Sequence, residues 1–166
     1  MAPGGCKSGA AFDLTGAYRY LFRRAWDTAL PSVGFIMLNP STADQHHDDP
    51  TIRRCLGFAR AWGFGSLEVV NLFALRATSP AALLASPDPV GPENDEHIRA
   101  MAARVDLVVA AWGNHGARFG RDAEVARLLG GRVTCLRVTA QGQPKHPLYV
   151  PGSVRPQPWR MTVPSL

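Results

Sequence analysis

The feature that most constrains the fold is an apolar run at residues 33–38, which stops abruptly at Asn39-Pro40-Ser41. The run holds β-branched and aromatic residues, and it is long enough for a buried strand but too short for a helix. Pro40 cannot donate a hydrogen bond to a sheet, and it disfavours helical geometry at Asn39. We therefore predict a buried strand that ends at Asn39. Ligands bind at the carboxyl ends of strands in open α/β sheets, so Asn39 is a candidate site residue, with a plain turn former as the alternative.

Further apolar runs predict more strands, and helical patterns separate them. The predicted strands cover residues 67–73, 106–112 and 133–138, and the predicted helices cover residues 51–62, 93–104 and 121–129. Asp49 followed by Pro50 predicts the start of the first helix, because Asp caps helices and Pro favours their first turn. An aromatic stretch at residues 18–23 predicts an additional strand at or beneath a sheet edge. The alternation predicts an α/β fold, a three-layer α/β/α sandwich around a mostly parallel central sheet of about four strands.

The length of 166 residues predicts one domain. The Gly- and Ala-rich start predicts a flexible N-terminus over residues 1–14, followed by a single α/β domain over residues 15–166. No apolar run approaches the roughly 18 residues of a membrane helix, and no secretory signal pattern is visible. Three widely spaced cysteines, Cys6, Cys55 and Cys135, match neither a disulfide framework nor a metal motif. We expect a cytoplasmic protein with reduced cysteines and no membrane partner.

The formal net charge is +5, and the basic residues are unevenly placed. No acidic residue follows Glu124, whereas six Lys and Arg residues do: Arg127, Arg132, Arg137, Lys145, Arg155 and Arg160. A segment with one sign of charge favours an anionic partner, either a nucleic acid or a nucleotide. A solvated basic surface would explain the charge equally well.

Five motifs together resemble a family of uncharacterised bacterial and phage proteins. They are Tyr-Arg-Tyr, Met-Leu-Asn-Pro-Ser-Thr-Ala-Asp, Asp-Asp-Pro-Thr, Asn-Leu-Phe-Ala-Leu-Arg and His-Pro-Leu-Tyr, and the resemblance covers about residues 15–160. This resemblance implies no function by itself.

The order of four motifs also resembles the uracil-DNA glycosylase superfamily. Met-Leu-Asn-Pro resembles the motif whose Asn positions the attacking water, and Val-Asn-Leu-Phe resembles the motif whose Asn reads the base edge. Residues 107–113 are similar to its third strand, and His146-Pro147-Leu148 is similar to its last motif, whose His stabilises the departing base. The resemblance implies a glycosylase-like fold and hydrolysis of the N-glycosidic bond of a modified or deaminated nucleobase in nucleic acid.

Residue by residue, the resemblance implies three sets of roles. The catalytic set is Asn39, His146 and Asp44, where Asp44 is the nearest substitute for a missing water-activating Asp. The base-binding set is Asn71, Pro40 and Ser41. The nucleic-acid-binding set is Lys145, Leu148, Tyr149, Arg76 and Arg53, with Leu148 in place of a phosphate-binding serine. We expect DNA, a nucleotide or a nucleoside as partner, and neither a cofactor nor a metal.

Two alternative functions remain open from the sequence. The same fold can serve a catalytically silent nucleic-acid or nucleotide binder, which the missing acid and serine favour. A metal-dependent hydrolase using His46, His47, Asp48 and Asp49 is less well supported, because their spacing matches no familiar zinc pattern. Asn71 as a satisfied core amide and His146 as an ordinary loop histidine also remain possible.

Overall fold

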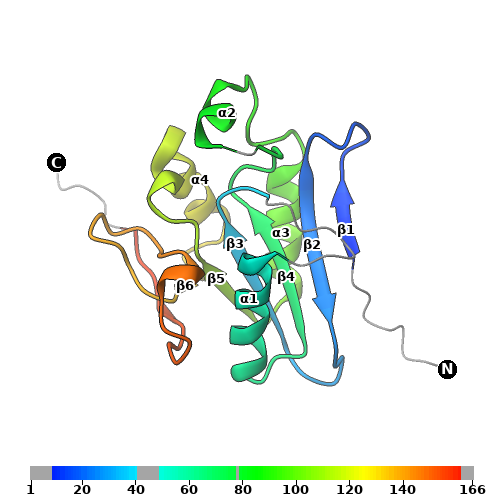
Figure 1. Cartoon of the computed structure of the whole chain (residues 1–166), viewed down its shortest axis with the longest axis vertical. Helices are drawn as coiled ribbons and strands as arrows, with labels where there is room; N and C mark the ends of the chain where they lie inside the picture. Colours follow the sequence, from blue (N-terminus) through cyan, green and yellow to red (C-terminus); the bar gives the residue numbers. More distant parts are fainter. Residues whose placement is uncertain (1–8, 41–48, 78, 162–166) are drawn as a thin grey trace.

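One mixed sheet with helices on both faces organises the chain (Figure 1). The computed structural model describes residues 9–40, 49–77 and 79–161. Across these residues the sheet has seven strands in the order β1-β2-β4-β3-β5-β6-β7. The strands are β1 (Gly9–Phe12), β2 (Arg19–Ala25), β3 (Ser32–Met37), β4 (Ser66–Asn71), β5 (Leu107–Ala110), β6 (Thr134–Cys135) and β7 (Gln157–Pro158).

The predicted sheet of about four mostly parallel strands is wrong in the number of strands and in their directions. The central strands β4, β3, β5 and β6 are indeed parallel, but β1, β2 and β7 extend the sheet with antiparallel pairs. The reason is that β1 lies in a Gly- and Ala-rich stretch, and β7 has only two residues, one of them Pro. Neither stretch carries a strand pattern, so the sequence predicted the parallel centre and the strand at residues 18–23, which is β2, but not β1 or β7.

The predicted helices are confirmed. They are α1 (Pro50–Ala61), α3 (Asn94–Arg104) and α4 (Arg121–Leu128), and a short α2 (Pro80–Ala85) precedes α3. Asp49 caps α1 as expected, because its Oδ1 accepts a hydrogen bond from the Ile52 amide at 2.8 Å. No helix in the part of the chain that the structure describes is long and apolar enough to cross a membrane.

Two apolar clusters form the core, one on each face of the sheet. On one face, α1 packs through Ile52 and Phe58 against the side chains of Val33 and Phe35 on β3. On the other face, α3 and α4 pack against the alternate residues of β3 and β4; this cluster includes Ile98, Met101, Val125, Ile36 and Val70. The helices therefore form the outer two of three layers, which is the predicted layering.

The two central strands end together, and this end positions the site. The parallel ladder between β3 and β4 continues past both strands, because the Leu72 amide donates to the Met37 carbonyl and the Phe73 amide donates to the Leu38 carbonyl. Asn39 and Asn71 consequently lie at the same carboxyl edge of the sheet.

Gly65 and Gly57 give a matched test of the packing. A Cβ on Gly65 would lie 1.8 Å from the Asp27 carbonyl oxygen, whereas a Cβ on the helical Gly57 would meet nothing within 4 Å. Gly65→Ala should lower the free energy of unfolding by about 2 kcal/mol, because main chain must move to relieve the clash. Gly57→Ala should raise it by about 0.5–1 kcal/mol through helix propensity. Urea denaturation measures both, and equal effects would contradict the placement of Gly65.

Candidate functional site

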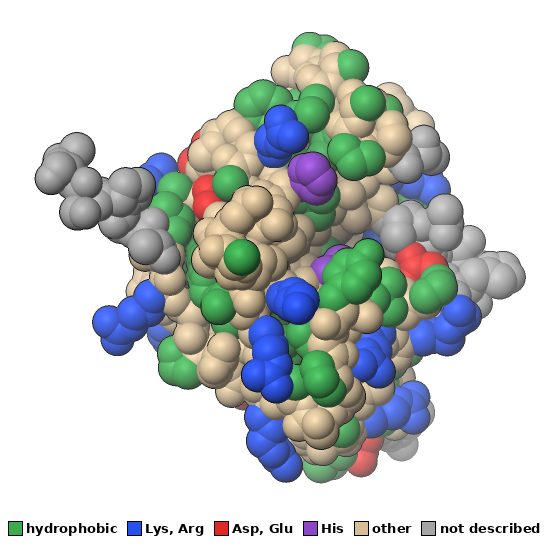
Figure 2. Space-filling view, turned by 60° about the vertical axis from the view of Figure 1, so that its left-hand side comes forward, with side chains coloured by type: hydrophobic (Ala, Val, Ile, Leu, Met, Phe, Trp, Pro, Cys, Tyr) green, Lys and Arg blue, Asp and Glu red, His purple; other side chains and the backbone are tan. Residues whose placement is uncertain are grey.

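A cavity of about 1300 Å³ opens at the carboxyl edge of the parallel strands, next to the start of α1. Figure 2 shows a hollowed face on which His, Lys and Arg side chains gather. The cavity brings together most of the sequence-predicted site residues: Asn39, Pro40, Asn71, Arg76, Lys145, His146, Leu148 and Tyr149. Arg53 is exposed on α1 and does not line the cavity. Asp44 and Ser41 lie outside the described residues.

Asn71 is the most informative of these residues. Its side chain is 1% exposed, and its Nδ2 has no hydrogen-bond partner within the described part of the protein. Leaving a buried donor without a partner costs about 1–3 kcal/mol. Because Asn71 lines the cavity, an acceptor on a bound ligand can meet this donor. A satisfied core amide, the simple alternative from the sequence, does not describe this side chain.

Asn39 is held in one orientation by its own amide group. Its Nδ2 donates to the carbonyl of Ala77 at 3.0 Å and to that of Pro40 at 3.3 Å. These bonds fix the amide plane, and they leave Oδ1 as the acceptor that this side chain can present to a ligand or water.

His146 presents a neutral imidazole to the cavity. Its Nδ1 accepts a hydrogen bond from the Leu148 amide at 3.2 Å, so the proton of the neutral ring belongs on Nε2. Burial lowers the pKa of His146 below its usual value of 6.5, and the nearby Asp49 carboxylate opposes this shift. At neutral pH the ring is therefore a donor through Nε2 without carrying a full charge.

The loop that carries His146 is tied to α1. This loop contains a short 3-10 helix, η2 (Pro147–Tyr149), and Arg54 of α1 donates to the carbonyl of its first residue, Pro147, and to that of Val150, which directly follows it. The loop and the helix that starts at Asp49 consequently form one wall of the cavity.

The cavity has a positive balance of charge. Arg19, Arg76 and Lys145 line it, and Asp49 is the one carboxylate among its described lining residues. This balance favours an anionic ligand.

Arg19 was not among the predicted site residues, although it is 2% exposed and lines the cavity. Arg19 and Leu21 of β2 stand opposite two consecutive residues of β1, so Tyr20 is an extra residue and forms a β-bulge. The bulge places Arg19 on the same face as Phe22, and the guanidinium lies 5.1 Å from the Phe22 ring centroid. The Tyr-Arg-Tyr motif marks this place, but a bulge leaves no pattern that a single sequence reveals.

Trp112 is a second lining residue without an assigned role from sequence. Its indole Nε1 donates to Oε1 of Gln143 at 2.9 Å, and Gln143 in turn donates to Asp122 at 3.0 Å. The next residue, Gly113, has a φ of 76°, which suits glycine, and it lets the main chain form part of the cavity wall.

A metal centre finds no support in the described residues, among which no three His, Cys, Asp or Glu side chains could hold a metal ion together. Of the four residues in the metal hypothesis, His46, His47 and Asp48 lie outside the described residues, and Asp49 caps α1. Cys55 and Cys135 are buried free cysteines, and Cys6 is not described.

Comparison with known proteins gives a family and no function. Residues 19–148 match the model of a family described as "Protein of unknown function (DUF1643)". No curated protein and no solved structure matches the chain. The match confirms the expected kinship with an uncharacterised family, and the resemblance to uracil-DNA glycosylases is not shown by it.

The protonation state of the His146 imidazole can be tested by NMR titration. We expect a pKa below 6.5, and a further decrease in Asp49→Asn, because this change removes the negative charge that opposes the shift. Asn caps helices about as well as Asp, so α1 should stay intact. The pKa of the half-buried His97 is set by burial, Glu93 and Arg104, so His97 should titrate alike in both proteins. A His146 pKa above 6.5, or one that ignores Asp49→Asn, would contradict this placement.

Proposed function

Since the chain belongs to the DUF1643 family of proteins of unknown function, we propose its function from the site itself: hydrolysis of the N-glycosidic bond of a modified or deaminated nucleobase in nucleic acid. The observation that carries the proposal is the buried Nδ2 of Asn71, which has no partner among the described residues and lies in the cavity that Asn39 and His146 also line. This is the constellation that the resemblance to uracil-DNA glycosylases assigns to water, base and leaving group.

The three side chains have complementary roles in this chemistry. Oδ1 of Asn39 accepts a hydrogen bond from a water molecule that attacks the anomeric carbon. The electron pair of the broken bond passes to the base, and the Nε2 proton of neutral His146 stabilises the charge that develops on a base oxygen. Asn71 donates to the edge of the base after the base has left the stack. The proton released by the water balances the departing anion, so the products are the free base and a sugar hydroxyl.

The rim of the cavity suits a polynucleotide. Leu148 and Tyr149 on η2 are 46% and 72% exposed, although both are large apolar side chains. Next to them lies Lys145, and Arg76 lies on the rim as an exposed cation. Cations bind phosphates without reading sequence, and an exposed apolar side chain can fill the gap that a flipped base leaves.

A specific observation also favours a binder without catalysis. Asp49 is the one carboxylate in the described lining, and its Oδ1 is already engaged at the N-terminus of α1. Only its second oxygen can then act on water. A protein that binds a flipped base or a nucleotide without cleaving it would need no such group.

Release of free base from oligonucleotides tests the proposal directly. Single- and double-stranded substrates carrying uracil, deaminated purines or modified pyrimidines would be incubated with wild type, Asn39→Ala, Asn71→Ala and His146→Ala. We expect each substitution to lower the rate about 100-fold or more, because each removes a group that acts in the transition state. Arg99→Ala, which breaks an exposed pair with Glu96 on α3, is the control and should match wild type.

Base release that persists in Asn39→Ala and His146→Ala would remove these residues from the mechanism. Tight binding without release by wild type would favour the binder. If wild type neither releases base nor binds the oligonucleotides, a role on nucleic acid is ruled out.

The salt dependence of binding tests the contact with phosphate. Lys145→Ala should weaken binding of a uracil-containing oligonucleotide and reduce the slope of log K against log salt by about 1, the share of one phosphate contact. Leu148→Ala should weaken binding without changing the slope, because its contact is apolar. Fluorescence anisotropy over a salt series measures both, and an unchanged slope in Lys145→Ala would contradict a phosphate role for Lys145.

A further inference from the structure

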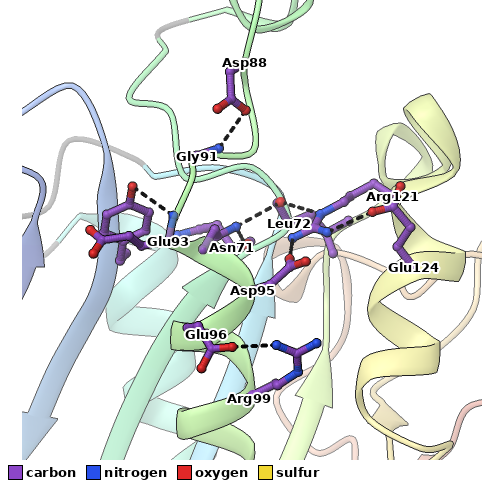
Figure 3. Close-up of polar contacts among 12 residues, drawn as sticks. Asn71, Leu72, Asp88, Gly91, Glu93, Asp95, Glu96, Arg99, Arg121 and Glu124 are labelled. Atoms are coloured by element: carbon purple, nitrogen blue, oxygen red, sulfur yellow. Dashed lines mark hydrogen bonds and ion pairs between the residues drawn. The ribbon is translucent and has the colours of Figure 1, made fainter.

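A buried polar network binds the main-chain carbonyls of Asn71 and Leu72 (Figure 3). Nδ2 of Asn94 donates to the carbonyls of Asn71 at 2.8 Å and Leu72 at 3.1 Å. Nε of Arg121 donates to the same Leu72 carbonyl at 2.8 Å. Two consecutive carbonyls at the end of β4 are thus held by side chains from α3 and α4.

The arginine in this network is itself fixed by two carboxylates. Its Nη2 lies 2.6 Å from Oδ1 of Asp95 on α3, and its Nη1 lies 3.2 Å from Oε2 of Glu124 on α4. Arg121 is 1% exposed, whereas both carboxylates are about half exposed. We call Asn94, Asp95, Arg121 and Glu124 the carbonyl clamp. Through it, three separate elements, α3, α4 and the end of β4, meet at one point.

Stability alone does not account for the carbonyl clamp. Burial of the Arg121 guanidinium has a desolvation cost, which offsets its attraction to the two half-exposed carboxylates. Asn94 is fully buried, and its Oδ1 has no partner within the described part of the chain. A residue that leaves one buried polar atom unsatisfied while its other polar atom holds two carbonyls is suited to fixing geometry.

The geometry that it fixes is that of Asn71. The Leu72 amide donates to Met37 on one side, while the Leu72 carbonyl is held by the carbonyl clamp on the other. Asn71 has a short side chain, so the position of its Nδ2 in the cavity follows the main chain closely. We infer that Asn94 and Arg121 are positioning residues that set Asn71 for recognition of an acceptor-bearing base edge. This inference rests on the role proposed above for Asn71.

The first test needs no ligand. Arg121→Lys keeps the charge but loses the planar fork, and Arg99→Lys makes the same exchange in the exposed pair on α3. Hydrogen exchange of the amides of residues 72–74 should accelerate at least about tenfold in Arg121→Lys and stay at the wild-type rate in Arg99→Lys. The side-chain amide signals of Asn71, assigned by their absence in Asn71→Ala, should shift only in Arg121→Lys. If Arg121→Lys does not fold, Asn94→Ala replaces it.

The second test is a double-mutant cycle in base release. Arg121→Lys should lower the rate about tenfold in the wild-type background, because a small displacement of a positioning group is costly. In the Asn71→Ala background it should lower the rate by less than about twofold, since its target is gone. The inference would be overturned if Arg121→Lys lowered the rate by the same factor in both backgrounds. It would also be overturned if Arg121→Lys left the amide hydrogen-exchange rates and the Asn71 side-chain signals unchanged. If wild type releases no base at all, the proposed function fails, while the exchange rates and amide signals still decide whether the carbonyl clamp positions Asn71.

Discussion

The parallel pairing of β3 with β4 is the constraint on which the site depends. Its hydrogen bonds continue beyond the strands to Leu72 and Phe73, so the segments that follow β3 and β4 leave the sheet side by side and in register. Asn39 and Asn71 therefore reach the same edge because of backbone pairing, without any direct bond between their side chains. The core on both faces fixes this register, since a slip of one residue would turn Phe35 and Ile36 toward the wrong layers.

The edge of the sheet carries polar groups that the fold itself does not satisfy. Among the residues that the structure describes, the buried Nδ2 of Asn71 has no acceptor and the buried Oδ1 of Asn94 has no donor. Each costs stability in the empty protein, and apolar residues of similar shape would avoid that cost. Only Asn71 lines the cavity, so a ligand could offset the cost at Asn71 but not at Asn94. In the proposed roles, Asn71 meets the ligand, and Asn94 holds Asn71 in place.

Much of this arrangement is visible in the sequence, and what is missing has a common cause. The strand just before Asn39 and the cap at Asp49 follow from local patterns, and the gathering of Asn39, Asn71 and His146 at one cavity is what the resemblance to uracil-DNA glycosylases implies. The antiparallel strands β1 and β7, the bulge that places Arg19 and the network around Arg121 do not follow. These features arise from contacts between segments far apart in the chain, and Arg121 is 49 residues from the carbonyl that it binds. A helix-starting arginine also looks in sequence like an ordinary surface residue, although here it is among the most buried.

In the reaction proposed above, different groups of the cavity bind the anion and handle the leaving group. Arg76 and Lys145 are basic residues on its lining, and they suit phosphates that are charged before and after the reaction. His146 is different, because burial keeps its ring neutral and the Leu148 amide directs its proton to Nε2. A neutral donor stabilises a base that becomes negative only as the bond breaks, and it does not bind the uncharged base tightly beforehand. Such selectivity for the transition state is what a catalyst requires, and a simple binder would gain more from a further cation at this position.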